Sequence, residues 1–172
     1  MTAPPDVPGV RGNEVRVARA DLADPVQAEA VLALIDTYAR DLMGGGEPLP
    51  PAVRDRLIPG LRAHPTTLVF LAWDGTEAIG AAVCFLGYST FAARPLVNIH
   101  DLSVVPAWRG RGVGRLLLRA VADWARAHDC CKVTLEVLDH NRRARALYDS
   151  EGFRPPDMGH PGEQMLFLTK AL

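Results

Sequence analysis

The chain has 172 residues, a length typical of one domain built around a single hydrophobic core. Hydrophobic residues make up 48% and charged residues 23%, so the composition excludes a disordered or collagen-like chain. The longest apolar run, residues 78–88, is well short of the roughly 20 residues that cross a bilayer, and we expect no membrane helix. The net charge of −1, without a basic stripe interleaved with aromatic residues, argues against nucleic-acid binding.

The N-terminal residues show no basic segment followed by an apolar core, so the sequence predicts no secretory signal and a cytoplasmic location. We expect residues 1–13 to form a flexible tail and residues 14–172 to form one domain. Three cysteines, Cys84, Cys130 and Cys131, are an odd number without the spacing of zinc ligands. They are interpreted as reduced structural thiols, and no metal site is expected.

The first predicted elements are a strand and a helix. Alternating apolar residues predict a strand over residues 14–20. Asp24 is a good N-cap and Pro25 suits a first helical turn; apolar residues then recur at helical spacing as far as Leu42. The helix is expected to end at the three glycines of residues 44–46. A loop at residues 47–51 and a second helix or turn at 52–62, disturbed by Pro59 and Gly60, follow.

Strands dominate the middle of the chain. Residues 67–73 and 78–86 flank the hairpin dipeptide Asp74-Gly75, so they should pair antiparallel. A long strand at 96–105 passes into a helix at 112–128, and the strand that follows should lie parallel to the first with a right-handed crossover. The last predicted elements are a strand at 132–138, a helix at 141–151 capped by Gly152, and a strand at 164–169. This order predicts an α/β fold with a mixed sheet.

The glycine-rich segment 109–114, Arg-Gly-Arg-Gly-Val-Gly, lies between a predicted strand and a predicted helix. Unpaired N–H groups and the positive dipole end collect there, and glycines let the backbone approach oxygen atoms, so an anion such as pyrophosphate is expected. The spacing excludes a P-loop, which needs Lys and Ser/Thr after the last glycine. It also excludes a dinucleotide fingerprint, because Arg115 and Leu117 stand where its third glycine is required.

With Arg109, Gly112 and Gly114 in its three fixed positions, the segment resembles the acyl-CoA signature Q/R-x-x-G-x-G/A of the GNAT acetyltransferase superfamily. The resemblance extends back to residue 98 and forward to residue 153. It implies the GNAT fold: a mixed central sheet of about six to seven strands, flanked by about four helices, with a splayed parallel strand pair that binds acyl-CoA. It also implies that acetyl-CoA is the co-substrate and that an amine is the acceptor. A homodimer is compatible with it.

The resemblance assigns roles to three groups of residues. Backbone amides of the glycine turn would hold the pyrophosphate, and strand residues 102–104 would bind the pantetheine arm. The helix capped by Asn141 would place Tyr148 near the CoA sulfur. The implied acyl-CoA-binding residues are Leu102, Ser103, Val104, Arg109, Gly110, Arg111, Gly112, Val113, Gly114, Arg115, Asn141, Ala144 and Tyr148.

The implied reaction is direct attack of a neutral amine on the thioester. Tyr148 matches the family tyrosine that donates a proton to the departing thiolate. For the base we choose His100, whose ordinary pKa of about 6.5 suits neutral pH, with Asp101 and Glu136 in reserve. Strand alternation places His100 on one face of its strand and Asp101 on the other, so the two should not form a pair. Transfer through a cysteine is disfavoured.

The acceptor is not identified by the sequence. Acidic residues of the first helix and the region that follows it, together with Tyr38, would suit a cationic amine, but a solvated helix face is the favoured explanation for them. The acidic residues concerned are Asp36, Asp41, Glu47 and Asp55. An alternative function is an acyl-CoA-binding sensor without turnover, but such a module has no chemical need for both His100 and Tyr148.

Overall fold

A computed structural model of the chain describes residues 15–155 and 167–170. The predicted N-terminal tail, residues 1–13, lies outside these residues. The elements, in chain order, are β1 (Arg16–Arg19), α1 (Pro25–Ala39), α2 (Pro51–Ala63), β2 (Thr67–Asp74), β3 (Glu77–Ser89), β4 (Arg94–Val104), the short 3-10 helix η1 (Pro106–Trp108), α3 (Val113–Ala127), β5 (Val133–Leu135) and α4 (Arg142–Ser150). None of the helices in these ranges is long and apolar enough to cross a membrane.

The described strands form one mixed sheet in the order β1-β2-β3-β4-β5. The first four pair antiparallel and β5 pairs parallel to β4, which confirms the predicted hairpin and the predicted crossover. Five strands lie within the described residues, where about six to seven were expected for the whole chain. Residues 164–166 of the predicted last strand lie outside the described residues, and Phe167–Thr169 are not in a strand.

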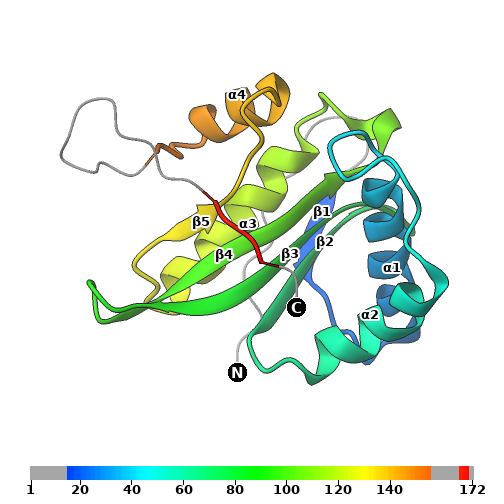
Figure 1. Ribbon diagram of the computed structural model, residues 1–172, viewed down its shortest axis with the longest axis horizontal. Helices are drawn as coiled ribbons and strands as arrows, with labels where there is room; N and C mark the ends of the chain where they lie inside the picture. Colours follow the sequence, from blue (N-terminus) through cyan, green and yellow to red (C-terminus); the bar gives the residue numbers. More distant parts are fainter. Residues whose placement is uncertain (1–14, 156–166, 171–172) are drawn as a thin grey trace.

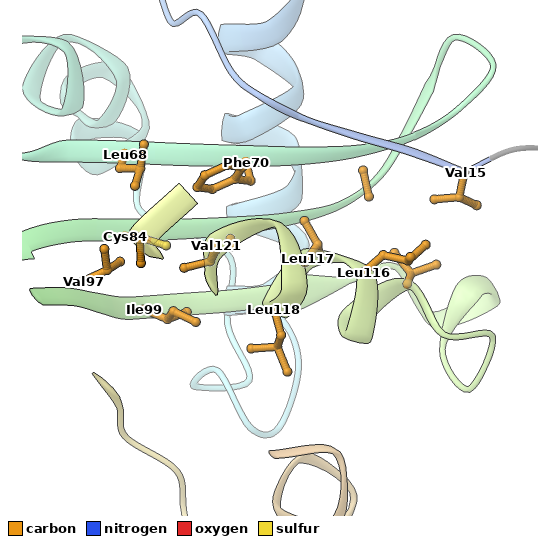
Figure 2. Close-up of a cluster of buried hydrophobic side chains, with 14 of the residues drawn as sticks. Val15, Leu68, Phe70, Cys84, Val97, Ile99, Leu116, Leu117, Leu118 and Val121 are labelled. Carbon is orange, nitrogen blue, oxygen red and sulfur yellow. The ribbon is translucent and has the colours of Figure 1, made fainter. Parts of the chain in front are cut away.

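Helices cover both faces of the sheet (Figure 1). One apolar cluster lies between the sheet and α3, with Leu117 and Val121 fully buried against Val97 and Ile99 of β4 (Figure 2). The second cluster packs Val31, Leu34 and Ile35 of α1 against the opposite face. Burial of this kind is the main favourable contribution to folding, so the position of the sheet between the two clusters is well determined.

Two predictions about the first helices were wrong. Helix α1 ends at Ala39, and Leu42 is 88% exposed although it fits the helical spacing. The reason is a local turn: the carbonyl of Asp41 accepts hydrogen bonds from the N–H groups of residues 44–46, and its carboxylate accepts from Met43 N. In contrast, α2 continues through Pro59 and Gly60 to Ala63, where a disturbance was expected.

The parallel strands β4 and β5 separate soon after they meet. They pair only from Val97 and Val133 to Ile99 and Leu135, while β4 continues to Val104. The strand expected over residues 132–138 is therefore shorter, and Glu136 lies beyond its end. On the side of β4 that faces β5, residues from 100 onward have no partner strand among the described residues. The backbone groups on that side are available to a ligand.

Candidate active site

A cavity of about 470 Å³ opens where β4 and β5 part. Its walls are residues 102–104 of β4, the glycine turn and first residues of α3, one side of α4, and the chain just after α1. We call it the α3–α4 cavity. All of the residues expected to bind acyl-CoA line it except Arg111. Of the four catalytic candidates, Tyr148 lines it, whereas His100, Asp101 and Glu136 do not.

The glycine turn presents its backbone to this cavity. Gly110 and Gly112 have φ angles of +80° and +87°, in the left-handed region that favours glycine. Gly112 is the N-cap of α3, and no side chain among the described residues caps that end of the helix. The N–H groups of the first turn consequently lack intrahelical partners and carry the positive end of the helix dipole. The arrangement suits an anion such as a phosphate.

The three arginines of the turn are already engaged within the protein. Arg109 donates to the carbonyl of Val104 at 2.9 Å and pairs with Asp41 at 2.8 Å. Arg115 pairs with Glu151 at 2.7 Å, and the guanidinium of Arg111 lies 5.2 Å from the centre of the Trp108 ring. Arg109 thus connects the loop after α1 to the end of β4 and stabilises the cavity wall.

The sequence prediction missed one basic residue of the cavity. Arg143 lies in the first turn of α4 and lines the wall, and one of its terminal nitrogens lies 3.8 Å from where a Cβ of Gly110 would stand. It forms no ion pair with another described residue. Its neighbour Arg142 does not line the cavity. Two adjacent arginines follow Asn141 in the sequence and could have suggested a basic residue at the site. Only the packing of α4 shows that Arg143, and not Arg142, lines the cavity.

Two tyrosines from different helices line the cavity. Tyr148, on α4, packs against Phe153 with ring centres 5.9 Å apart, and burial raises its pKa to about 12, helped by Tyr38 nearby. Tyr38, on α1, donates a hydrogen bond to the carbonyl of Met43 at 3.4 Å. Burial, Asp101 and Asp41 together raise the pKa of Tyr38. Both phenols therefore remain protonated, and able to donate, through the neutral pH range.

The expected alternation along β4 is interrupted at His100. Asp101 pairs with Val83 of β3 and Ile99 pairs with Cys84, so His100 is the extra residue of a β-bulge. The prediction that His100 and Asp101 face opposite sides was wrong. His100 contacts Phe85, which packs in the cluster under α1 and α2. Asp101 precedes by two strand residues Ser103, whose hydroxyl donates to the Leu34 carbonyl of α1, so both side chains belong to the face that α1 and α2 cover. No particular amino acid marks this bulge in the sequence, so the alternation of apolar and polar residues could not predict it.

The environments of the candidate bases differ. His100 is exposed, whereas burial raises the pKa of the Asp101 carboxyl, an effect that nearby His100 opposes. Glu136 is exposed and accepts hydrogen bonds from Asn98 Nδ2 at 3.3 and 3.4 Å. Asp101 lies beside both His100 and the cavity residue Tyr38, whereas the recorded partner of Glu136 is Asn98. A histidine and a carboxylate side by side suit the acceptance of an ammonium proton.

Two of the acidic residues considered for binding the amine have structural partners instead. Asp36 is buried; its carboxylate accepts from the N–H of Leu49 at 2.9 Å and pairs with Arg40 and Arg54, each at 3.0 Å. These donors hold the pKa of Asp36 below its ordinary value, with the Leu49 hydrogen bond as the main cause. Asp41 is held in the turn and by Arg109, as described above. Glu47 and Asp55 are exposed.

The cysteines lie away from this chemistry. Cys84 is fully buried among the apolar residues that face α3, and burial raises its pKa to about 12. A thiol in that setting is a poor nucleophile at neutral pH. Cys130 and Cys131 follow α3 as free thiols.

Comparison with known proteins identifies the family of the chain. The sequence profile of the acetyltransferase (GNAT) family matches residues 31–153, most of the chain and the whole of the site. The chain belongs to the GNAT family. This GNAT protein is 36% identical over 115 residues to the N-alpha-acetyltransferase RimI of Mycobacterium tuberculosis, a match that covers 66% of each chain. It is 35% identical over 79 residues to the thialysine N-epsilon-acetyltransferase of Bos taurus, 46% of each chain.

Solved structures show the same fold. The aminoglycoside N-acetyltransferase AAC(6')-Iy, in complex with CoA, superimposes with a TM-score of 0.70 at 20% identity, over 94% of this chain and 98% of that one. The α/β architecture with a mixed sheet is thus that of the GNAT acetyltransferases, whose co-substrate is acetyl-CoA. Matches to the curated relatives span between about half and two thirds of their lengths.

Proposed function

We propose that this GNAT protein is an N-acetyltransferase that transfers the acetyl group of acetyl-CoA to a primary amine of a small molecule or peptide. The observation that carries the proposal is the α3–α4 cavity, in which an uncapped helix end, a glycine turn and the unpaired edge of β4 meet. The acceptor is defined only as an amine, because relatives with similar sequences act on different amines.

The donor half of the proposal rests on the cavity lining. N–H groups of residues 110–115 would hold the pyrophosphate of acetyl-CoA, and Arg143 supplies a positive charge beside Gly110. Residues 102–104 border the place where β4 loses its partner strand, so their backbone groups would bond the pantetheine arm. Asn141 accepts from the N–H of Ala144 at 3.1 Å and fixes the start of α4, which brings Tyr148 to the cavity.

The catalytic half of the proposal assigns a base and an acid. His100 would accept the ammonium proton, so that the neutral amine attacks the thioester carbonyl; Asp101 and Glu136 are the reserves. An N–H group near Val104 would stabilise the oxyanion. Val105 donates its N–H to Ile79 of β3, so the N–H of Val104, one residue earlier, points to the opposite, open side of the strand. Tyr148 would donate its hydroxyl proton to the departing thiolate. Its raised pKa keeps the donor form populated.

The test is a thermal-shift titration with acetyl-CoA, CoA and NAD, followed by measurement of thiol release with a panel of amines. A ligand at about 100 times its Kd adds roughly 2.7 kcal/mol to the free energy of unfolding. We expect stabilisation by acetyl-CoA and CoA but not by NAD, and thiol release with at least one amine. Stabilisation without release from any amine would favour the acyl-CoA sensor, and no shift with either CoA species would overturn the donor site.

A further inference from the structure

One ion pair ties the loop after α1 to the end of β4 at which the acetyl group would react. Asp41 lies two residues beyond the end of α1, and its Oδ2 pairs with Arg109 Nη1 at 2.8 Å. The Nε of the same guanidinium donates to the carbonyl of Val104 at 2.9 Å. We call these three residues the Asp41–Arg109–Val104 bridge. Only 22% of the Asp41 side chain and 30% of the Arg109 side chain are exposed, so water and salt screen this pair less than a surface pair.

Asp41 is a fixed end of this bridge. Its carbonyl accepts hydrogen bonds from three N–H groups of residues 44–46, and its Oδ1 accepts from the N–H of Met43 at 2.9 Å. These bonds hold the carboxylate so that its second oxygen meets Arg109. The Met43 N–H and the Arg109 guanidinium also keep the pKa of the Asp41 carboxyl below its ordinary value, so it is charged at neutral pH.

The other end of the bridge is the open edge of β4. Val105 donates its N–H to the carbonyl of Ile79 in β3, so the N–H and the carbonyl of Val104 both point to the opposite side. On that side no described strand pairs with this part of β4, and Arg109 bonds the Val104 carbonyl where a neighbouring strand would otherwise do so. The residue held in this way is the one whose N–H would stabilise the oxyanion.

We propose that Asp41 is a positioning residue for acetyl transfer: through Arg109 it holds Val104 in the orientation that its N–H needs to meet the developing oxyanion. The inference rests on the proposed function. It gives Asp41 an effect on the transition state and none on the binding of acetyl-CoA, because the guanidinium of Arg109 is directed to Asp41 and Val104 and not to the glycine turn.

The test removes the ion pair and keeps the turn. In Asp41→Asn the amide oxygen can still accept from the N–H of Met43, whereas the charge that holds Arg109 is lost. Glu29→Gln is the matched control, because it makes the same chemical change at an exposed position of α1 that does not line the cavity. Steady-state rates are measured with the amine that gives the fastest thiol release, and the Kd for CoA is measured by calorimetric titration.

We expect Asp41→Asn to lower kcat by about tenfold, less than the roughly 100-fold or more that follows the loss of a whole oxyanion donor. The KM for the amine and the Kd for CoA should not change, and Glu29→Gln should behave as wild type. Arg109→Met should also lower kcat, and the double variant should lose no more than Arg109→Met alone, because both changes break the same bridge. Asp41→Ser, whose hydroxyl can accept from Met43, replaces Asp41→Asn if that variant does not fold.

The other results overturn the inference. An unchanged kcat in Asp41→Asn would leave the ion pair as a structural contact, and an equal loss of kcat in Glu29→Gln would indicate a general effect of charge. A rise in the Kd for CoA or in the KM for the amine, in place of a lower kcat, would make Asp41 a binding residue. Losses that add in the double variant would show that Asp41 and Arg109 act separately. If the wild type acetylates no amine, or does not bind acetyl-CoA, the proposed function itself fails.

Discussion

The proposed chemical role of Tyr148 can be tested without changing how its ring packs. Its ring contacts Phe153, and its hydroxyl lies in a cavity where burial raises the pKa to about 12. Removing only the hydroxyl, in Tyr148→Phe, should lower kcat by about 100-fold, the lower end of what a positioned acid contributes. The KM for acetyl-CoA should change little, because the ring remains. Steady-state kinetics measure both values, and an unchanged kcat would leave Tyr148 as a packing residue.

Arg143 is expected to act on binding and not on chemistry. Loss of its charge in Arg143→Ala should raise the Kd for CoA by about tenfold, as a charge-assisted hydrogen bond is worth roughly 1.5–3 kcal/mol. Arg142→Ala removes the same charge from the adjacent residue, which does not line the cavity, and should leave the Kd unchanged. Calorimetric titration with CoA makes the comparison. An equal rise of the Kd for CoA in the two variants would indicate a general electrostatic effect, and not a contact between Arg143 and CoA.

The choice of base is decided by the pH profile. A base must be unprotonated to work, so kcat/KM falls as the pH drops through its pKa. With His100 as base, His100→Ala should lower kcat/KM by about 100-fold and remove that acid limb. Burial raises the pKa of Asp101, so a carboxylate base would give a limb above the ordinary carboxyl range. Such a limb would survive in His100→Ala and disappear in Asp101→Asn, which would transfer the role to Asp101.

Residue patterns predicted part of the site and could not predict the rest. The glycine turn is recognisable because glycine is needed at positive φ, and its neighbours in the motif follow from the resemblance. Tyr38 and Arg143 line the same cavity, but nothing local separates them from surface residues; the packing of α1 and α4 places them there. The shared face of His100 and Asp101 depends on a bulge that strand alternation cannot show.

At the scale of elements, the fit between β3 and β4 depends on a residue without a side chain. A Cβ on Gly80 would lie 2.9 Å from the carbonyl oxygen of Ser103 and 3.1 Å from Leu117 Cδ1. Gly80→Ala should therefore lower the free energy of unfolding by about 1–3 kcal/mol, as overpacking does. Gly60→Ala makes the same chemical change in open space within a helix and should raise it by roughly 0.5–1 kcal/mol. Urea unfolding measures both; a loss of equal size in the two would refute the packing argument.

Helices and strands with a clear local sequence pattern were predicted correctly. The errors occur where contacts with distant parts of the chain determine where an element ends. The pairing of β2 with β3 and the amphipathic α3 follow from turn chemistry and apolar spacing, although the loop is Gly75-Thr76 and Asp74 ends β2. The end of α1 does not, because the Asp41 turn overrides the spacing that included Leu42. The early end of β5 has a similar origin: β4 departs from it after Ile99, and that separation forms the cavity.

For the whole molecule, the two walls of the α3–α4 cavity differ in how firmly they are held. Helix α3 contributes six buried residues, whereas α4 contributes none. Helix α4 is attached by the partly buried Leu147 and Tyr148 and by the ion pairs of Glu151 with Arg115 and Arg119 at 2.7 and 2.9 Å. Since few apolar contacts accompany it, α4 should open locally at low free energy in the unliganded protein.

A ligand that bridges the two walls must be released before α4 can open. At about 100 times its Kd, acetyl-CoA should therefore slow hydrogen exchange of the α4 amides by about 100-fold. Amides of α2 provide the internal control, because α2 does not line the cavity and its local opening does not require ligand release. Exchange followed by mass spectrometry, with and without acetyl-CoA, gives both rates in one sample. Equal slowing in α2 and α4 would mean that the protein opens only as a unit, and no slowing in α4 would place the ligand elsewhere.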